Sequence, residues 1–187
     1  MGGPGLNVEL KARDPNPRRS LSRCREIGAE DGGVLIQHDT YFRAVAARLK
    51  LREQEGIAPH LIAYDRPDFR GRRQSRYEVT DVERPEELRT VLAAALGIRV
   101  EVAKRRRLFR WDGVRIHLDN VDGLGAFIEF EAIVSAPEEF SYRHRQVDEL
   151  KKAFEIREAD IVAIGYGELL LAANNPGEVN GPVRSNA

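Results

Sequence analysis

The sequence predicts an α+β fold in which an antiparallel sheet curls into a barrel with flanking helices. Six or more segments alternate charged with apolar residues at a period of two, which is typical of strands. The sign of the charge differs between segments, and only about four helices are predicted to cover the apolar side. An ordinary one-sided sheet would turn its charged face to water. A barrel would instead place charges of both signs around a ligand in its lumen.

Length and charge limit the class of protein. With 187 residues, 30 of them basic and 30 acidic, the chain suits one domain with a substantial core and no net attraction to nucleic acid or a membrane surface. It lacks an apolar run of the ~20 residues that span a bilayer, and its first residues do not resemble a secretory signal. The single cysteine, Cys24, excludes an intrachain disulfide, favours a cytoplasmic location and is interpreted as a small core residue.

The first half of the chain is predicted to alternate strands with one helix. Residues 7–13 form a first strand that presents Asn7, Glu9, Lys11 and Arg13 together. A short helix follows over residues 18–29, and Gly32-Gly33 is predicted to turn the chain. Residues 34–42 then resume as a strand with Gln37, Asp39 and Tyr41 on one side.

Three further strands are predicted over residues 48–53, 59–66 and 76–80. The first of them has the cleanest alternation in the sequence, with Arg48, Lys50 and Arg52 on one face and two leucines on the other. The basic stretch 70–74 is predicted to be an exposed loop.

A helix is predicted to open at Pro85, with acids in its first turn, and to end at Gly97. A strongly basic strand over residues 99–111 follows, and Asp112-Gly113 is a strong signal for a tight turn. Two helices are predicted at residues 138–153 and 158–172. The folded domain is therefore expected to span residues 1–173. Residues 174–187 are poor in apolar side chains and are expected to form a disordered tail.

Residues 115–131 predict a hairpin that carries an acidic cluster. Asp119 belongs to the first arm, which also places Arg115 and His117 on its charged face, and Glu129 and Glu131 belong to the second arm. All three carboxylates share one face only if the connection has an odd number of loop residues or contains a bulge. A tight four-residue loop would separate them.

A wet lumen of mixed charge suits a metal-bound polyphosphate. Glu9, Asp119, Glu129 and Glu131 are hard oxygen ligands for Mg2+ or Mn2+. Six cations would neutralise the phosphates: Lys11, Lys50, Arg52, Lys104, Arg106 and Arg115. This interpretation requires Asp119, Glu129 and Glu131 to face Glu9 across the lumen. Since the chain has no glycine-rich phosphate loop, side chains alone would hold the phosphates.

Five segments, in order, resemble the CYTH or triphosphate tunnel metalloenzyme superfamily, and in particular bacterial class IV adenylyl cyclase-like members. They are Asn7-Val8-Glu9-Leu10-Lys11, Gln37-His38-Asp39-Thr40-Tyr41-Phe42, Arg48-Leu49-Lys50-Leu51-Arg52-Glu53, Arg115-Ile116-His117-Leu118-Asp119 and Phe127-Ile128-Glu129-Phe130-Glu131. The likeness runs over residues 6–172. It implies a closed, eight-stranded antiparallel tunnel, dependence on a divalent metal, and a nucleoside triphosphate or another triphosphate as substrate.

The resemblance also implies roles for individual residues. The family's metal carboxylates correspond to Glu9, Glu129 and Glu131, with Asp119 nearby, and its phosphate-binding cations to the six named above. Weaker candidates are Asn7, Arg66, Arg76 and His117. Asn7 stands where the family motif usually has its first glutamate, so one negative charge is missing and the number of metals is left open. His117 is expected to contact substrate, assist proton transfer or serve as a hydrogen-bonded neighbour.

The motifs are compatible with more than one activity. The resemblance favours adenylyl cyclase chemistry, in which ATP gives cyclic AMP and pyrophosphate. A triphosphatase acting on thiamine triphosphate or inorganic tripolyphosphate is an alternative, since both reactions need metal and cations on the developing charge. A non-catalytic triphosphate- or polyphosphate-binding protein is a third. The outer face of the sheet is a candidate surface for a homodimer.

Overall fold

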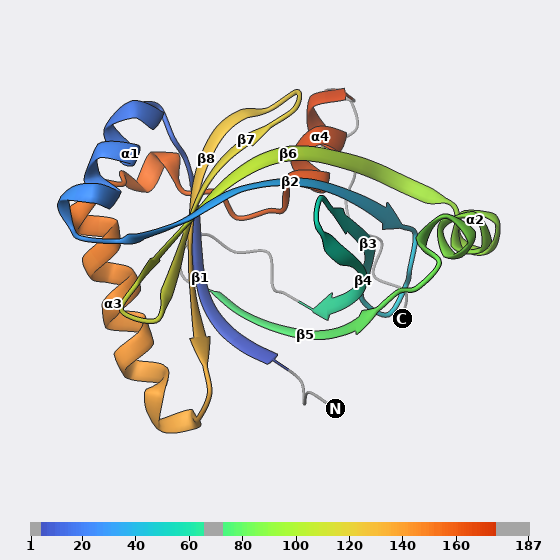
Figure 1. Cartoon of the computed structure of the whole chain (residues 1–187), viewed down its shortest axis with the longest axis horizontal. Coiled ribbons are helices and arrows are strands. Elements are labelled where there is room, and N and C mark those ends of the chain that lie inside the picture. The colour runs from blue at the N-terminus through green and yellow to red at the C-terminus, as the bar shows by residue number, and fades with distance from the viewer. Residues whose placement is uncertain (1–4, 66–72, 175–187) are drawn as a thin grey trace, which may run out of the picture.

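A computed structural model describes residues 5–65 and 73–174 of the chain. Figure 1 shows a strongly curled sheet with helices at its ends and sides. The elements follow the order β1 (Gly5–Arg13), α1 (Pro17–Glu26), β2 (Glu30–Phe42), β3 (Arg48–Gln54), β4 (Ile57–Asp65), β5 (Arg73–Asp81), α2 (Pro85–Leu96), β6 (Ile98–Trp111), β7 (Val114–Val121), β8 (Gly125–Val134), a 3-10 turn (Pro137–Glu139), α3 (Phe140–Ala153), a second 3-10 turn (Glu158–Asp160) and α4 (Tyr166–Asn174).

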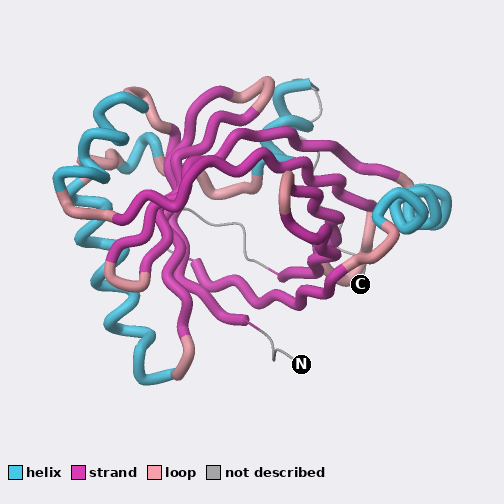
Figure 2. The backbone as a smooth tube through the Cα atoms, in the orientation of Figure 1, coloured by secondary structure: helices cyan, strands magenta, loops and turns pink. Residues whose placement is uncertain are grey.

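The predicted antiparallel barrel is confirmed. Its strands pair in the order β1-β5-β4-β3-β2-β6-β7-β8, and β1 pairs again with β8, so the hydrogen-bonded ring returns to its start. Over the described residues the wall is uneven, because the β2–β6 ladder has eleven residue pairs and the β1–β5 ladder five. In Figure 2 the strands curl around a common interior.

The apolar face of the long strands packs outward against helices. Leu10, Ile116 and Phe130 are buried in a cluster that also takes Cys24 from α1 and Leu150 from α3. Helices α1 and α3 lie beside β1, β7 and β8, whereas α2 lies at the far end of the barrel (Figure 1). Because the apolar residues face the helices, the alternating charged residues face the interior of the barrel. Within the described residues, no helix combines the length and hydropathy needed to cross a bilayer.

A second, smaller cluster fills one end of the barrel interior. Val102, Val121 and Phe127 pack there with Val162 and with Tyr166 at the start of α4. The Phe127 and Tyr166 rings meet edge to face at 5.0 Å between their centres. The polar part of the lumen therefore has an apolar floor at this end.

The turns set the register of the β7–β8 hairpin. Val121 pairs with Gly125, which leaves a three-residue turn at 122–124, the odd number that the shared carboxylate face requires. At the preceding turn Trp111 pairs with Val114, and Asp112 and Gly113 both have positive φ, 45° and 75°. Two consecutive left-handed residues are what a two-residue hairpin turn needs, so the Asp112-Gly113 prediction is confirmed.

The predicted helix over residues 158–172 is wrong in its first half. A 3-10 turn ends at Asp160, Ile161 is extended, and residues 162–165 are not helical, so α4 begins only at Tyr166. Among the described residues, β5 pairs with only the first five residues of β1, and a later segment of the chain pairs further along β1. Ile161 forms a bridge with Ala12, and the Val162 N–H donates to the Lys11 carbonyl. Satisfying these backbone groups of β1 outweighs the helical preference of the segment.

Two further boundaries differ from the sequence expectation. Gly32 and Gly33 do not turn the chain but lie in β2, where a register shift between Asp31 and Val34 marks a bulge. β5 begins at Arg73, inside the predicted loop. Arg66, residues 70–72 and the predicted tail from residue 175 lie outside the described residues.

Replacing Phe130 with alanine is expected to lower the free energy of unfolding by about 3–5 kcal/mol, the usual cost of emptying a buried aromatic site. Phe130 is fully buried and meets the Phe154 ring at 5.3 Å. Urea unfolding of the variant measures the loss. Val91→Ala, at an exposed position on α2, is the control and should change stability little. A loss of less than about 1 kcal/mol for Phe130→Ala would contradict the assignment of this cluster as the main core.

Candidate active site in the barrel lumen

The barrel encloses a cavity of about 680 Å3. Its wall includes every predicted metal and phosphate ligand with a described side chain except Asp119. These residues are Asn7, Glu9, Lys11, Lys50, Arg52, Lys104, Arg106, Arg115, His117, Glu129 and Glu131. Arg76 belongs to β5, where its backbone pairs with Leu6 and Asp65, but its side chain lies outside the described part of the structure.

The acids of β1 and β8 are neighbours on one wall. Glu9 pairs in register with Glu131, and Lys11 pairs with Glu129. The expectation that Glu9 faces these acids across the lumen is therefore wrong, because β1 is hydrogen-bonded to β8 rather than opposite to it. Asn7 Nδ2 donates to Glu131 Oε1 at 2.7 Å, and Lys11 Nζ lies 3.0 Å from Glu129 Oε1.

This wall is connected to β7 by His117 and Arg115 and to β6 by Arg106, and Arg115 Nη1 lies 3.4 Å from Glu131 Oε2. His117 Nδ1 lies 3.5 Å from Glu129 Oε2, and its Nε2 lies 3.9 Å from Glu131 Oε2. Burial lowers the pKa of His117, and Arg106 adds to the effect. Burial alone would raise the pKa of Glu129, but Lys11, His117 and Arg106 together hold it well below its ordinary value. The lumen thus holds an ionised carboxylate at neutral pH.

Asp119 shares the inward face with Phe127 and Glu129, as its register predicts, but lies behind Arg106. Arg106 Nε and Nη2 donate to its two oxygens at 2.7 and 2.6 Å, and the Tyr166 hydroxyl donates to Oδ2 at 2.7 Å. Burial would raise the pKa of Asp119, yet Arg106 lowers it to about 2. These contacts fix Arg106, whose Nη2 also reaches Glu129 at 2.7 Å. Metal binding by Asp119 stays a prediction from the sequence.

Two buried residues at the site were missed by the sequence interpretation. Asp39 on β2 is fully buried among Lys50, Arg52 and Lys104. Its inward direction could be read from the alternation of residues 34–42, but its partners depend on a register between strands that the sequence does not give. Tyr166 lies under Lys11, with the ammonium 4.1 Å from the ring centre. It stands at a helix start, where no alternation identifies the inward face.

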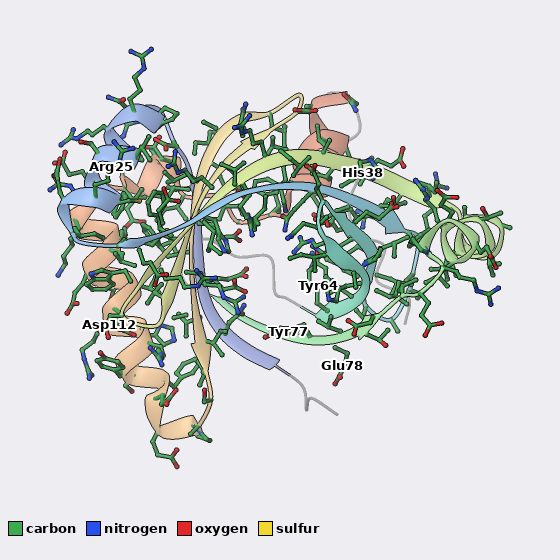
Figure 3. All side chains as sticks on the ribbon, in the orientation of Figure 1. Arg25, His38, Tyr64, Tyr77, Glu78 and Asp112 are labelled. Atoms are coloured by element: carbon green, nitrogen blue, oxygen red, sulfur yellow. The ribbon has the colours of Figure 1, made fainter. Side chains whose placement is uncertain are left out.

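Negatively and positively charged side chains of the lumen lie on different strands. Carboxylates concentrate on β1 and β8, whereas β3 and β6 contribute the cations Lys50, Arg52, Lys104 and Arg106. The described lining on β4 and β5 is mostly apolar or aromatic, with Ile57, Ile62, Tyr64, Tyr77 and Val79, and it also includes His60. Figure 3 labels Tyr64 and Tyr77 on these two strands.

The donor set of the acidic wall fits a hard divalent cation. Glu9, Glu129 and Glu131 supply only oxygens, which Mg2+ and Mn2+ prefer. Asn7 Oδ1 is buried and has no hydrogen-bond partner among the described residues, although its amide nitrogen holds Glu131. An acceptor left without a partner beside two carboxylates is a natural further ligand. In their present pairing with cations, no three His, Cys, Asp or Glu side chains of the described chain are grouped closely enough to hold a metal.

An eight-stranded antiparallel barrel with acids on one wall of its lumen and cations on another defines a recognisable class. The model of the CYTH domain matches residues 5–166, and the chain belongs to this family. It is 24% identical over 174 residues to a Methanocaldococcus jannaschii protein named "Putative adenylate cyclase", covering 88% of this chain and 98% of that one.

Solved structures have the same fold. The PH1012 protein of Pyrococcus horikoshii superposes with a TM-score of 0.76 at 23% identity, over 87% of this chain and 98% of that one. The protein HpAC1 of Hippeastrum, described as having a dominant triphosphatase activity, superposes with a TM-score of 0.59 at 13% identity, over 91% of this chain and 96% of that one.

Proposed function

We propose that the protein is a divalent-metal-dependent enzyme that acts on a triphosphate in the barrel lumen, and that its reaction is the conversion of ATP into cyclic AMP and pyrophosphate. The observation that carries this proposal is the content of one cavity: three carboxylates, an amide oxygen without a hydrogen-bond partner among the described residues, and seven cations, namely the six predicted ones and Arg110. Buried charges in such number cost desolvation energy. A polyanion bound together with a metal ion would offset both sets of charges, the polyanion against the cations and the metal ion against the carboxylates.

The cations would bind the phosphates. Lys50, Arg52 and Lys104 would bind from one wall, Lys11 and Arg115 from the side of the acids, and Arg106 of β6 from between them, since its guanidinium reaches Glu129. In the cyclase reaction the ribose 3'-hydroxyl oxygen bonds to the α-phosphorus and gives up its proton. The bond from that phosphorus to the bridging oxygen breaks, and pyrophosphate leaves with the electron pair. Cations already fixed around the leaving group stabilise the charge that develops there.

The metal would be held by the acidic wall. Glu9, Glu129 and Glu131, with Asn7 Oδ1, are the residues that would bind it. A bound Mg2+ or Mn2+ supplies a Lewis acid for phosphoryl oxygens. The side chains orient the phosphates against this wall, and Asp119 keeps Arg106 in place through a two-pronged contact.

The apolar surface of β4 and β5 supports a nucleoside as part of the substrate. Tyr64 and Tyr77, with Ile57, Ile62 and Val79, provide the kind of lining on which a base packs. Inorganic tripolyphosphate would leave this side of the cavity without a partner. This favours ATP over a bare polyphosphate.

A triphosphatase is the second candidate, favoured by the activity described for the Hippeastrum protein. In that reaction water attacks the terminal phosphorus and the diphosphate leaves. The same cations and metal would serve, because the two reactions differ in which phosphorus faces the nucleophile.

Incubation with ATP, thiamine triphosphate and tripolyphosphate, each with Mg2+ and with Mn2+, separates the candidates. We expect cyclic AMP and pyrophosphate from ATP, detected by chromatography. Orthophosphate from any of the three would assign a triphosphatase. Tight binding without product would leave a non-catalytic triphosphate-binding protein, and neither binding nor product would refute the proposal.

A further inference from the structure

Asp39 organises the cationic wall of the lumen. Its side chain has no exposed surface, and it accepts from Arg52 Nε at 2.7 Å and from Arg52 Nη2 at 2.8 Å. Lys50 Nζ and Lys104 Nζ lie 3.2 and 3.4 Å from the same oxygen, Oδ2. One carboxylate from β2 thus joins cations from β3 and β6.

The position of Asp39 separates it from the acids that fit a metal. In the ring of eight strands β2 stands four places from β1 in either direction, so Asp39 and Glu9 belong to opposite walls. Asp39 is a single carboxylate among three cations, and a divalent cation brought to it would be repelled by all three. Its contacts therefore indicate a partner for cations rather than a metal ligand.

The charges of this wall do not balance without a ligand. Three cations meet one carboxylate, which leaves an excess of positive charge in a buried place. Burial and Arg52 lower the pKa of Lys50 to about 8, against the opposing effect of Asp39. Burial also lowers the pKa of Lys104 well below its ordinary value, again against Asp39. Asp39 itself stays ionised, because Arg52, Lys50 and Lys104 outweigh burial and hold its pKa well below the usual range.

We propose that Asp39 is a positioning residue that keeps Lys50, Arg52 and Lys104 charged and aimed at the phosphates, and that it thereby sets the upper pH limit of triphosphate binding. The proposal rests on the proposed function, since it assigns the phosphates to this wall. Asp39 acts through the cations and does not touch the substrate.

Other groups face these lysines and contribute to the same titration. Lys50 also lies near the Tyr41 and Tyr64 rings, at 5.4 and 5.6 Å from their centres. Lys104 lies 5.3 Å from the Tyr166 ring centre. The charged and titratable groups that bear on the two lysines are Asp39 and Tyr41 on β2, Arg52 on β3, Tyr64 on β4, Arg106 on β6, Asp119 on β7 and Tyr166 on α4. Of the residues that the structure describes, Asp39 alone contacts both ammonium groups through one oxygen.

The test is the pH dependence of tripolyphosphate binding, measured by calorimetry in EDTA so that no metal takes part. In Asp39→Asn the lysines lose their counter-charge, so their pKa values fall further and the ammonium forms are lost at lower pH. We expect the alkaline midpoint of binding to move down by about one pH unit or more, because an opposite charge this close shifts a pKa by that amount. Affinity should fall about tenfold at pH 8 and change little at pH 6.

A second substitution predicts the opposite shift. In Lys104→Gln, Asp39 keeps only Lys50 and Arg52 as partners, and Lys50 no longer shares Asp39 Oδ2 with a second positive charge. The pKa of Lys50 should therefore rise, and the alkaline midpoint of tripolyphosphate binding should move up. This variant keeps the test decisive if Asp39→Asn does not fold. His38→Gln is the control, since His38 is the next residue of β2 and faces outward, near Glu53 and Glu101. It should leave both midpoint and affinity unchanged.

The outcomes separate this inference from the function on which it rests. A wild-type protein that binds tripolyphosphate in EDTA at no pH overturns the role of Asp39, and the proposed function is overturned as well only if ATP with Mg2+ or Mn2+ also gives neither binding nor product. A wild-type protein that binds, with Asp39→Asn showing the same midpoint or a loss that is equal at pH 6 and pH 8, overturns the role of Asp39 and leaves the proposed function standing. If Asp39→Asn does not fold, an unchanged or lower midpoint for Lys104→Gln overturns it.

Discussion

Glu129→Gln is expected to reduce metal-dependent turnover of the preferred triphosphate by at least about a hundredfold, in line with the loss of one strong electrostatic contact at a reacting centre. A neutral amide is a weaker ligand for a divalent cation than a carboxylate. It also leaves Lys11 and Arg106 without the anion that they now contact at 3.0 and 2.7 Å. Initial rates across a range of Mg2+ and Mn2+ concentrations measure the effect.

Glu131→Gln should behave in the same way, because Glu131 is the register partner of Glu9 on the same wall. Glu138→Gln, at an exposed acid in the 3-10 turn after β8, is the matched control and should retain full activity. Circular dichroism and thermal unfolding confirm that each variant is folded. A folded Glu129→Gln or Glu131→Gln protein with normal rates would refute the assignment of this wall to the metal.

Arg106→Leu is expected to lower the free energy of unfolding by about 3–5 kcal/mol, the usual effect of leaving a buried charge without its partner. Asp119 is 3% exposed and receives both prongs of the Arg106 guanidinium, so its carboxylate would remain in the interior with only the Tyr166 hydroxyl. Triphosphate binding should fall as well, since Arg106 lines the lumen. Urea unfolding and calorimetry with tripolyphosphate measure the two effects separately.

The double substitution Arg106→Leu with Asp119→Leu distinguishes the two contributions. An apolar pair of similar volume often replaces a buried ion pair at little cost, so most of the stability should return. Binding of tripolyphosphate should not return, because Arg106, the cation proposed to contact the phosphates, is still missing. A single Arg106→Leu variant within about 1 kcal/mol of wild type would show that Asp119 does not depend on Arg106.

The strands and their inward faces could be predicted because side-chain direction alternates along a strand whatever its neighbours are. The odd turn at 122–124 likewise follows from a local count, and it placed Asp119, Glu129 and Glu131 on one face. His38 points away from the lumen for the same reason of parity.

Which strands pair, when they are distant in the sequence, is not a local property and could not be predicted from the alternation of residues. Glu9 lies beside Glu131 because β1 and β8 are hydrogen-bonded, and Asp39 meets Lys104 because β2 lies between β3 and β6. The non-helical segment after Asp160 follows from its pairing with β1 at Ala12 and Lys11, which no pattern in residues 158–172 reveals. The homodimer and the metal-ligand role of Asp119 stay predictions.

A crystal structure with Mn2+ and tripolyphosphate, using the anomalous signal of manganese, tests the assignment of the lumen most directly. We expect manganese within bonding distance of carboxylate oxygens of Glu9, Glu129 or Glu131, at about 2.0–2.2 Å for a hard cation on oxygen. The phosphates should contact Lys50, Arg52 and Lys104 on the opposite wall. Manganese and tripolyphosphate bound outside the barrel, with an unchanged lumen, would contradict it.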